Sequence, residues 1–272
     1  MKEQIQGAPT EPDFASLTGL ISQVADLDEF RKSAWTSLPV ASDYWRAPME
    51  SSHLTARMKE LVLLGMHASA TSLNVDGVER HIRRALAAGA TAAEIIDVLI
   101  TIVALANHAL YFSVPILQEE LRKRGGDADG TEEFDPDFEA AKQAFIESRG
   151  FWNSDREAIA RLMPEYYQAL DAVSTESWNN GKLTTKEREF VCIGIDCTVT
   201  HNYEPGLRRH IRNALDLGAT REEILEVFQL AGLLGLESYI LGAKILFGHQ
   251  ASMTTAQEAA DRDLCRLTSC EQ

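Results

Sequence analysis

The chain has 272 residues, a formal net charge of −15 and an apolar fraction of 45%. Its length suits one large domain or two of ordinary size, and its composition is that of a globular protein with enough apolar residues for a core. The acidic balance argues against a nucleic-acid partner, because binding to phosphates requires a basic surface.

The first residues, MKEQIQGAPTEPDF, contain no apolar segment of the kind found in signal peptides. None of the four cysteines has C-x-x-C spacing, and nothing suggests a disulfide framework. A reducing, cytoplasmic location is therefore expected. The apolar stretch 95–117 is interrupted by Asp97, Asn107 and His108, so we expect a buried core helix and no membrane partner.

An internal repeat dominates the chain. When His81 is aligned with His210, residues 54–117 match residues 183–246 without a gap, and about a third of the aligned positions are identical. Residues 1–53 form a lead-in to the first copy, and residues 137–180 form a lead-in to the second. The Gly- and Asp-rich segment RKRGGDADGTEEFDP predicts a linker over 122–136.

The sequence of each copy predicts three main helices. The first helix begins after Thr55, and the second begins near Gly77 and ends at Gly89, where a left-handed residue would stop it. Thr91 and Glu94 predict a capping box that starts the third helix, which is expected to be long, apolar and central to the core. Thr220 and Glu223 repeat this signature in the second copy.

These elements predict an all-α fold of two tandem repeats, each a bundle of packed helical hairpins. The predicted domains are a first repeat over 1–121, a linker over 122–136, a second repeat over 137–250 and a polar tail over 251–272. No segment shows the alternation typical of strands.

The segment GLRRHIRNALDLGATREEILEVFQLAGLLG resembles the core signature of the carboxymuconolactone decarboxylase family, within the larger alkyl hydroperoxidase D-like group. The segment GVERHIRRALAAGATAAEIIDVLITIVALA resembles it more weakly. This resemblance implies an enzyme that needs no cofactor and decarboxylates a carboxylated muconolactone. It also implies a homo-oligomer, and for a fused pair of units a homotrimer with six repeats.

The peroxidase members of the wider group carry a C-x-x-C before the signature histidine. The corresponding positions here are Asn74 and Gly77 in the first repeat and Tyr203 and Gly206 in the second. Thiol-dependent peroxide reduction needs a reactive cysteine and a resolving partner, so this activity is disfavoured.

The paired histidines His81 and His210 are the first candidate catalytic residues, because imidazole exchanges protons near neutral pH. Glu60 and Glu189 occupy matched positions on the preceding helix, where the peroxidase relatives place an active-site Glu. A carboxylate there could orient the imidazole and raise its pKa. The alternatives are buried structural histidines and solvated glutamates at a helix start.

Further polar groups interrupt apolar helices or precede the second helix of repeat 2, and we predict that they bind substrate. A buried polar group without a partner is costly, so each should face a cavity or another polar group. The predicted substrate-binding residues are His67, His108, Asp196, Glu237, Tyr203 and Glu204. His201 belongs to the same loop as Tyr203 and could line the pocket or simply pack. The His and carboxylate sets could alternatively hold zinc or iron, although an H-x-x-x-H or H-x-H core is lacking.

The leading hypothesis is a cofactor-independent lyase that acts on a small carboxylated or lactone-like metabolite, with an anionic substrate expected. Three alternatives stay open: a metal-dependent hydrolase or oxygenase, a thiol-independent oxidoreductase of the wider group, and a non-catalytic oligomeric binder.

Overall fold

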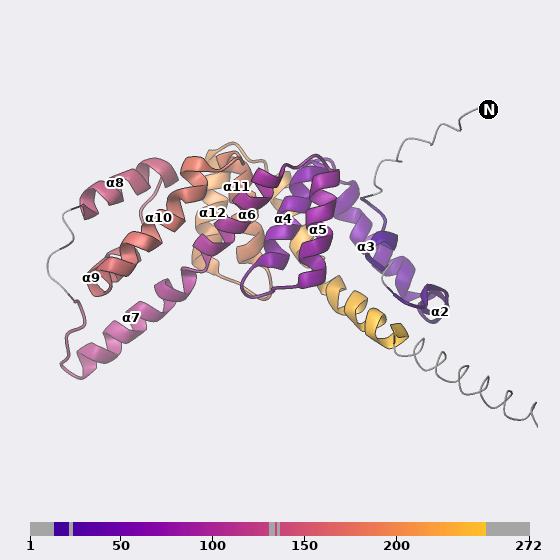
Figure 1. Cartoon of the computed structure of the whole chain (residues 1–272), viewed down its shortest axis with the longest axis horizontal. Coiled ribbons are helices and arrows are strands. Elements are labelled where there is room, and N and C mark those ends of the chain that lie inside the picture. The colour runs from indigo at the N-terminus through magenta and orange to yellow at the C-terminus, as the bar shows by residue number, and fades with distance from the viewer. Residues whose placement is uncertain (1–13, 22–23, 131–133, 135–136, 249–272) are drawn as a thin grey trace, which may run out of the picture. The chain divides into compact units, whose positions relative to one another are not determined.

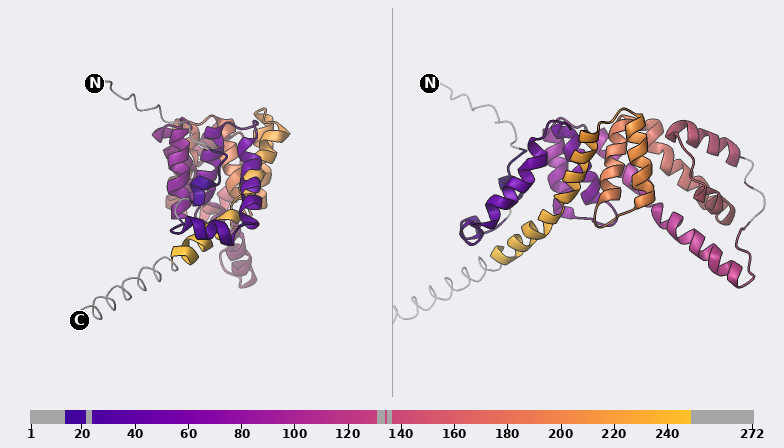
Figure 2. Two further views of the ribbon diagram at one scale, coloured as in Figure 1. Left: turned by 90° about the vertical axis from the view of Figure 1, so that its right-hand side faces the viewer. Right: turned by 180° about the vertical axis from the view of Figure 1, so that it is seen from behind.

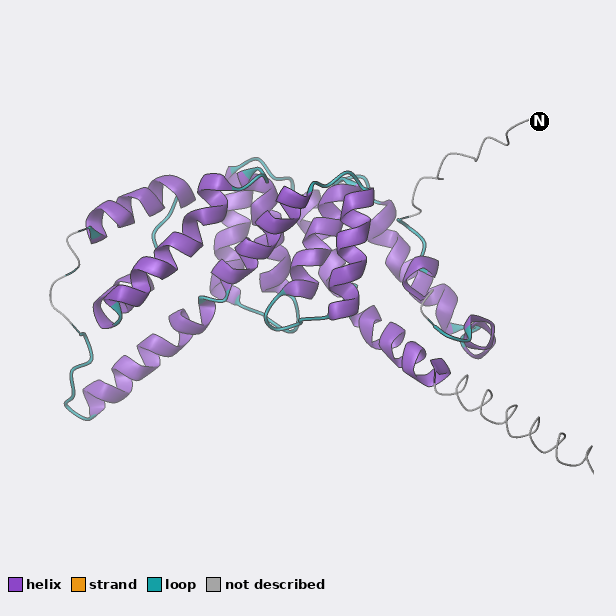
Figure 3. Ribbon diagram, viewed as in Figure 1, coloured by secondary structure: helices purple, strands orange, loops and turns teal. Residues whose placement is uncertain are grey.

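The computed structural model describes residues 14–21, 24–130, 134 and 137–248. Within these residues the chain forms helices and connecting turns and no strand, which confirms the all-α prediction (Figure 3). The helices are α1 (Thr18–Ile21), α2 (Leu27–Ser33), α3 (Ser37–Glu50), α4 (Ala56–Ala68), α5 (Val75–Ala87), α6 (Ala92–Leu105), α7 (His108–Lys123), α8 (Phe138–Arg149), α9 (Asp155–Leu162), α10 (Pro164–Asn180), α11 (Thr185–Cys197), α12 (Glu204–Asp216) and α13 (Arg221–Gly232). Residues 235–248 are also helical.

The chain divides into two compact units, one formed by residues 53–231 and the other by residues 1–52 with 232–272. This division differs from the predicted domain boundaries, which follow the repeats in sequence. The larger unit contains the core helices of both repeats, because α4 and α11 pack against each other in one shared core. The predicted tail over 251–272 and part of the predicted linker over 122–136 lie outside the described residues.

In the smaller unit, aromatic side chains join α2 to the helical residues 235–248. The ring of Phe30 lies 5.7 Å from that of Tyr239 and 5.4 Å from that of Phe247. The Ser37 hydroxyl lies 2.9 Å from that of Tyr239.

In the larger unit, two matched glycines allow α4 and α11 to approach closely, and Figures 1 and 2 show these helices side by side. A Cβ atom at Gly65 would lie 3.0 Å from Val191, and one at Gly194 would lie 2.8 Å from Met66. The two glycines occupy the same position in the two repeats. The repeats therefore pack reciprocally, like the subunits of a symmetric dimer.

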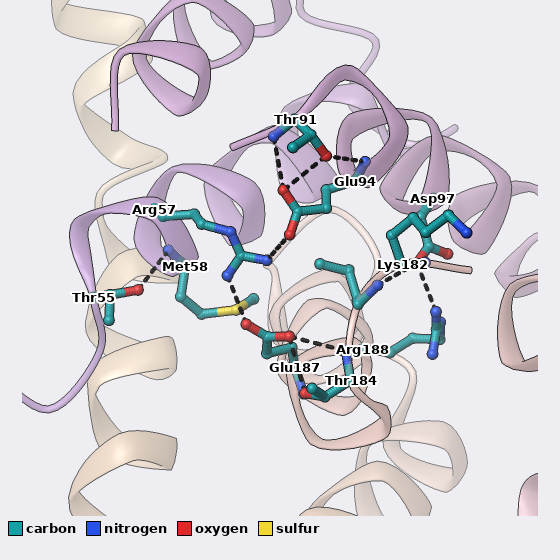
Figure 4. Close-up of polar contacts among 11 residues, drawn as sticks. Thr55, Arg57, Met58, Thr91, Glu94, Asp97, Lys182, Thr184, Glu187 and Arg188 are labelled. Atoms are coloured by element: carbon teal, nitrogen blue, oxygen red, sulfur yellow. Dashed lines mark hydrogen bonds and ion pairs between the residues drawn. The ribbon is translucent and has the colours of Figure 1, made fainter. Parts of the chain in front are cut away.

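Each repeat also supplies a carboxylate to the other. Asp97 of α6 accepts hydrogen bonds from the backbone N–H of Leu183 at 2.8 Å and from the Arg188 guanidinium at 2.6 Å, as Figure 4 shows for Arg188. At the matched place, Glu226 of α13 accepts from the backbone N–H of Leu54 at 3.2 Å and pairs with Lys59 at 3.0 Å. These buried ion pairs tie the start of each first helix to the third helix of the other repeat.

The predicted capping boxes are confirmed. Thr91 and Glu94 exchange both capping hydrogen bonds at the start of α6, and Thr220 and Glu223 do so before α13. Gly89 has a φ of +90°, the left-handed conformation that ends a helix without steric cost to glycine.

The prediction of one continuous third helix through residue 117 is wrong. The helix breaks at Ala106 and Asn107, between α6 and α7. The Ala106 N–H is shared between the carbonyls of Ile102 and Val103, each at 3.3 Å, and Asn107 donates to Ala104, which tightens the turn. A similar turn at 233–234 follows α13. The break places His108 at the start of a new helix.

Two helical stretches, 92–123 and 221–248, are apolar and long enough to cross a membrane by length and composition alone. The core helices of soluble proteins meet the same criterion. Here α6 packs against α4, α10 and α11, and its Asp97 is buried. This packing is that of a core helix.

Candidate active site

The structure brings His210 of α12 against Glu189 of α11. The His210 Nδ1 lies 2.5 Å from Glu189 Oε2, and Asn213 donates to the other carboxylate oxygen at 3.1 Å. The two side chains meet because α11 and α12 form a packed hairpin, so positions 21 residues apart face each other. Glu189 is buried, and His210 is 3% exposed.

The matched pair in repeat 1 has the same geometry. His81 Nδ1 lies 2.8 Å from Glu60 Oε2, and both residues are fully buried. The third partner differs, because the Arg84 guanidinium donates to Glu60 at 2.9 Å where repeat 2 has the neutral amide of Asn213. Both histidine–glutamate pairs anticipated from the sequence are therefore in contact.

The two imidazoles differ in their protonation. Burial lowers the pKa of His81 to about 4, and the nearby His67 and Arg80 lower it further against the opposing effect of Glu60. Burial also disfavours the cation of His210, but Cys192 and Glu189 outweigh it and raise its pKa well above the usual value. His81 is therefore neutral at pH 7, whereas His210 is an imidazolium.

A cavity of about 160 Å³ opens beside the repeat 2 pair, and His210 lines it. Tyr203 and His108, two of the predicted substrate-binding residues, line it as well. The opposite wall comes from the lead-in helices of repeat 2, α8 and α10, which contribute Arg149 and Trp178. The site is thus built from both repeats and from the segment between them.

Two arginines, Arg149 and Arg209, also line the cavity. The Arg149 guanidinium lies 3.4 Å from the ring centre of Trp178 and donates to the Ser174 carbonyl at 2.8 Å. The Arg209 guanidinium lies 4.6 Å from the ring centre of Phe151. Among the described residues, neither guanidinium forms an ion pair with a carboxylate. The sequence signal, Arg149-Gly150-Phe151, lies in a lead-in that no repeat pattern marks as functional.

A second polar cluster adjoins the cavity. His108 Nδ1 lies 2.9 Å from His201 Nε2, and both nitrogens approach Asp196 Oδ1, at 3.5 and 3.4 Å. The Tyr203 ring stacks on His108 at 3.9 Å between ring centres. Gly206 is required here, because a Cβ atom at this position would collide with Asp196 and Tyr203.

Burial sets the protonation of this cluster. It raises the pKa of Asp196 to about 7, an effect that Glu189 reinforces and His210 opposes. It lowers the pKa of His108 to about 3, with further contributions from His201, His210 and Arg149. Burial also lowers the pKa of His201, so both imidazoles of the cluster are neutral near pH 7.

The other predicted residues lie away from this cavity. His67 is buried on α4, where its Nδ1 lies 2.7 Å from the Leu63 carbonyl and its ring lies 4.6 Å from that of His81. Glu204 is exposed and pairs with Arg208 at 2.6 Å, so the prediction that it lines the pocket is not supported. Glu237 is partly buried in the smaller compact unit.

Comparisons with known proteins agree with this architecture. The profile of the carboxymuconolactone decarboxylase family matches residues 41–112 and 164–236. No curated protein matches at a significant level. A crystal structure from Burkholderia xenovorans LB400, described as a "putative gamma-carboxymuconolactone decarboxylase subunit", is similar with a TM-score of 0.79 and 31% identity, over 90% of this chain and 99% of that one. The chain therefore belongs to the carboxymuconolactone decarboxylase family and carries two copies of the family unit.

Proposed function

We propose that this protein is a lyase that decarboxylates a small, anionic, lactone-like metabolite in the cavity of repeat 2. The observation that carries the proposal is the His210–Glu189 pair, which borders a cavity that also contains two guanidiniums without carboxylate partners among the described residues. The family and the described function of the similar crystal structure support the same reaction class.

The cavity chemistry suits recognition of a carboxylate. The guanidiniums of Arg149 and Arg209 can donate paired hydrogen bonds to a carboxylate or a lactone carbonyl that the reaction retains. Trp178 and Tyr203 offer apolar ring faces for the remainder of a small molecule. The carboxylate to be lost would lie against these rings, where poor solvation favours its conversion to neutral CO₂.

In the proposed reaction, the bond between the substrate carbon and its carboxylate breaks and CO₂ leaves. The electron pair passes into the conjugated carbonyl, which becomes an enolate. The His210 imidazolium then gives its proton to the carbon, while Glu189 holds the other ring nitrogen in place. His81 lacks these features, because it is neutral and fully buried.

Replacement of each histidine by Gln tests this assignment, with CO₂ release from a carboxylated muconolactone as the readout. His210→Gln should lower kcat by about 10²- to 10⁴-fold, the usual contribution of a general acid. His81→Gln is the matched control and should leave kcat within a few-fold once folding is verified. Unchanged turnover in His210→Gln would refute the proposal.

A further inference from the structure

We propose that His108, Asp196 and His201 bind a divalent first-row transition-metal ion, with Zn²⁺ as the probe of choice. The three ligands come from α7, from α11 and from the loop between α11 and α12. Their donor set of two imidazoles and one carboxylate is a common one for zinc and non-haem iron and leaves coordination positions open.

The distances between the ligand atoms fit a shared ion. Zinc lies about 2.0–2.2 Å from nitrogen and oxygen ligands, so two ligands of one tetrahedral or octahedral ion are about 3.0–3.4 Å apart. The three atoms here, His108 Nδ1, His201 Nε2 and Asp196 Oδ1, are separated by 2.9, 3.4 and 3.5 Å. They form a compact triangle, as the face of a coordination polyhedron requires.

The carboxylate of Asp196 supplies a second, independent observation. The residue has no exposed surface, and neither of its oxygens accepts a hydrogen bond within the part of the chain that the structure describes. A buried carboxylate without donors is costly, and a cation at the triangle would satisfy it. A Cβ atom at position 206 would collide with the second oxygen, Oδ2, so only glycine fits beside this carboxylate.

Repeat 1 does not reproduce this ligand set. At the matched positions, repeat 1 has His67 in place of Asp196 and Ser72 in place of His201. Repeat 1 instead contributes His108, which the break between α6 and α7 brings across to the second copy. The ligand set therefore combines residues of both copies.

The ion would also lie next to the proposed acid. Asp196 Oδ2 is 3.9 Å from His210 Nε2, while Asp196 Oδ1 belongs to the ligand triangle. His108 lines the same cavity as His210, so an open coordination position could face a bound molecule. Metal binding does not depend on the decarboxylase proposal, because the acid–base steps above use side chains alone.

The full-length chain is first freed of metal by dialysis against a chelator. Titration with Zn²⁺ in competition with a chromophoric chelator then tests the inference. Wild-type protein should bind Zn²⁺, and both Asp196→Asn and His201→Gln should lose one equivalent or bind it about 100-fold more weakly. His53→Gln, at an exposed histidine outside the cluster, should bind like the wild type.

Circular dichroism and thermal melting verify the fold of each variant. If Asp196→Asn does not fold, His201→Gln alone tests the metal site. This variant is expected to fold, because His201 lies in a loop and is only partly buried. Co²⁺ substitution should give a visible d–d spectrum that the same variants abolish. Equal zinc affinity in wild type, Asp196→Asn and His201→Gln would overturn the site and leave the decarboxylase proposal untouched.

Discussion

The two histidine–glutamate pairs occupy the same place in duplicated units, yet their chemistry differs. His81 and His210 each contact a buried glutamate through Nδ1, at 2.8 and 2.5 Å. The pKa of the first lies at about 4, and that of the second lies well above 6.5. Identity at the signature positions therefore does not determine the protonation state of the imidazole.

The neighbours of each pair account for the difference. In repeat 1, burial lowers the pKa of His81, and His67 and Arg80 lower it further against the opposing effect of Glu60. In repeat 2, Cys192 and Glu189 raise the pKa of His210 against the effect of burial, and Asp196 takes the place of His67. Repeat 2 thus stabilises a cation at its histidine, whereas the cation that contacts Glu60 in repeat 1 is Arg84.

The largest expected effect concerns the two glutamates. Glu60→Gln should lower the free energy of unfolding by about 3–5 kcal/mol at pH 7, because Arg84 stays charged when its buried partner is lost. Glu189→Gln should cost less, because His210 can release its proton and Asn213 is neutral. Chemical denaturation of both variants measures the difference, and equal losses would contradict this account of the pairs.

The pH dependence of stability should have opposite signs at the two histidines. Because the folded pKa of His81 is depressed to about 4, its contribution is present above the unfolded value of 6.5 and is lost as pH falls from 6.5 through 4. The raised pKa of His210 gives a contribution that is full below 6.5 and is lost as pH rises through the folded value.

Melting temperatures across this range separate the two effects. His81→Gln should flatten the acid side of the stability profile, and His210→Gln should flatten the alkaline side. The same change of profile in both variants would show that the two sites are electrostatically equivalent.

The smallest expected effect concerns substrate affinity. Arg209→Met keeps the apolar contact with Phe151 but removes the guanidinium. KM should therefore rise about tenfold, which corresponds to the loss of one charged hydrogen bond, and kcat should change less. Arg212→Met provides a control, because Arg212 lies two positions after His210 on the same helix and does not line the cavity. A KM equal to that of the wild type would remove Arg209 from substrate recognition.

Local signals in the sequence predicted much of this architecture. The capping box at Thr91 and Glu94 and the pairing of His81 with Glu60 follow from spacing within one helix or one hairpin. Such contacts join residues close in sequence, so helical periodicity and turn chemistry suffice to anticipate them.

The remainder depends on long-range packing. The contact of His108 with His201 joins residues 93 positions apart in different repeats and requires the helix break after Leu105. Arg149 reaches the cavity from a lead-in helix that has no repeat signature. Neither contact has a local pattern, because each arises only when separate elements meet in the folded core.

The buried ion pairs between the repeats affect how such a chain can evolve. Asp97 neutralises Arg188, and Glu226 neutralises Lys59, so a half produced alone would expose this interface and lack the counter-charge of its cation. Each half therefore depends on the other for a neutral interface. Once joined, however, they no longer have to remain identical, and one can keep the chemistry while the other becomes its scaffold.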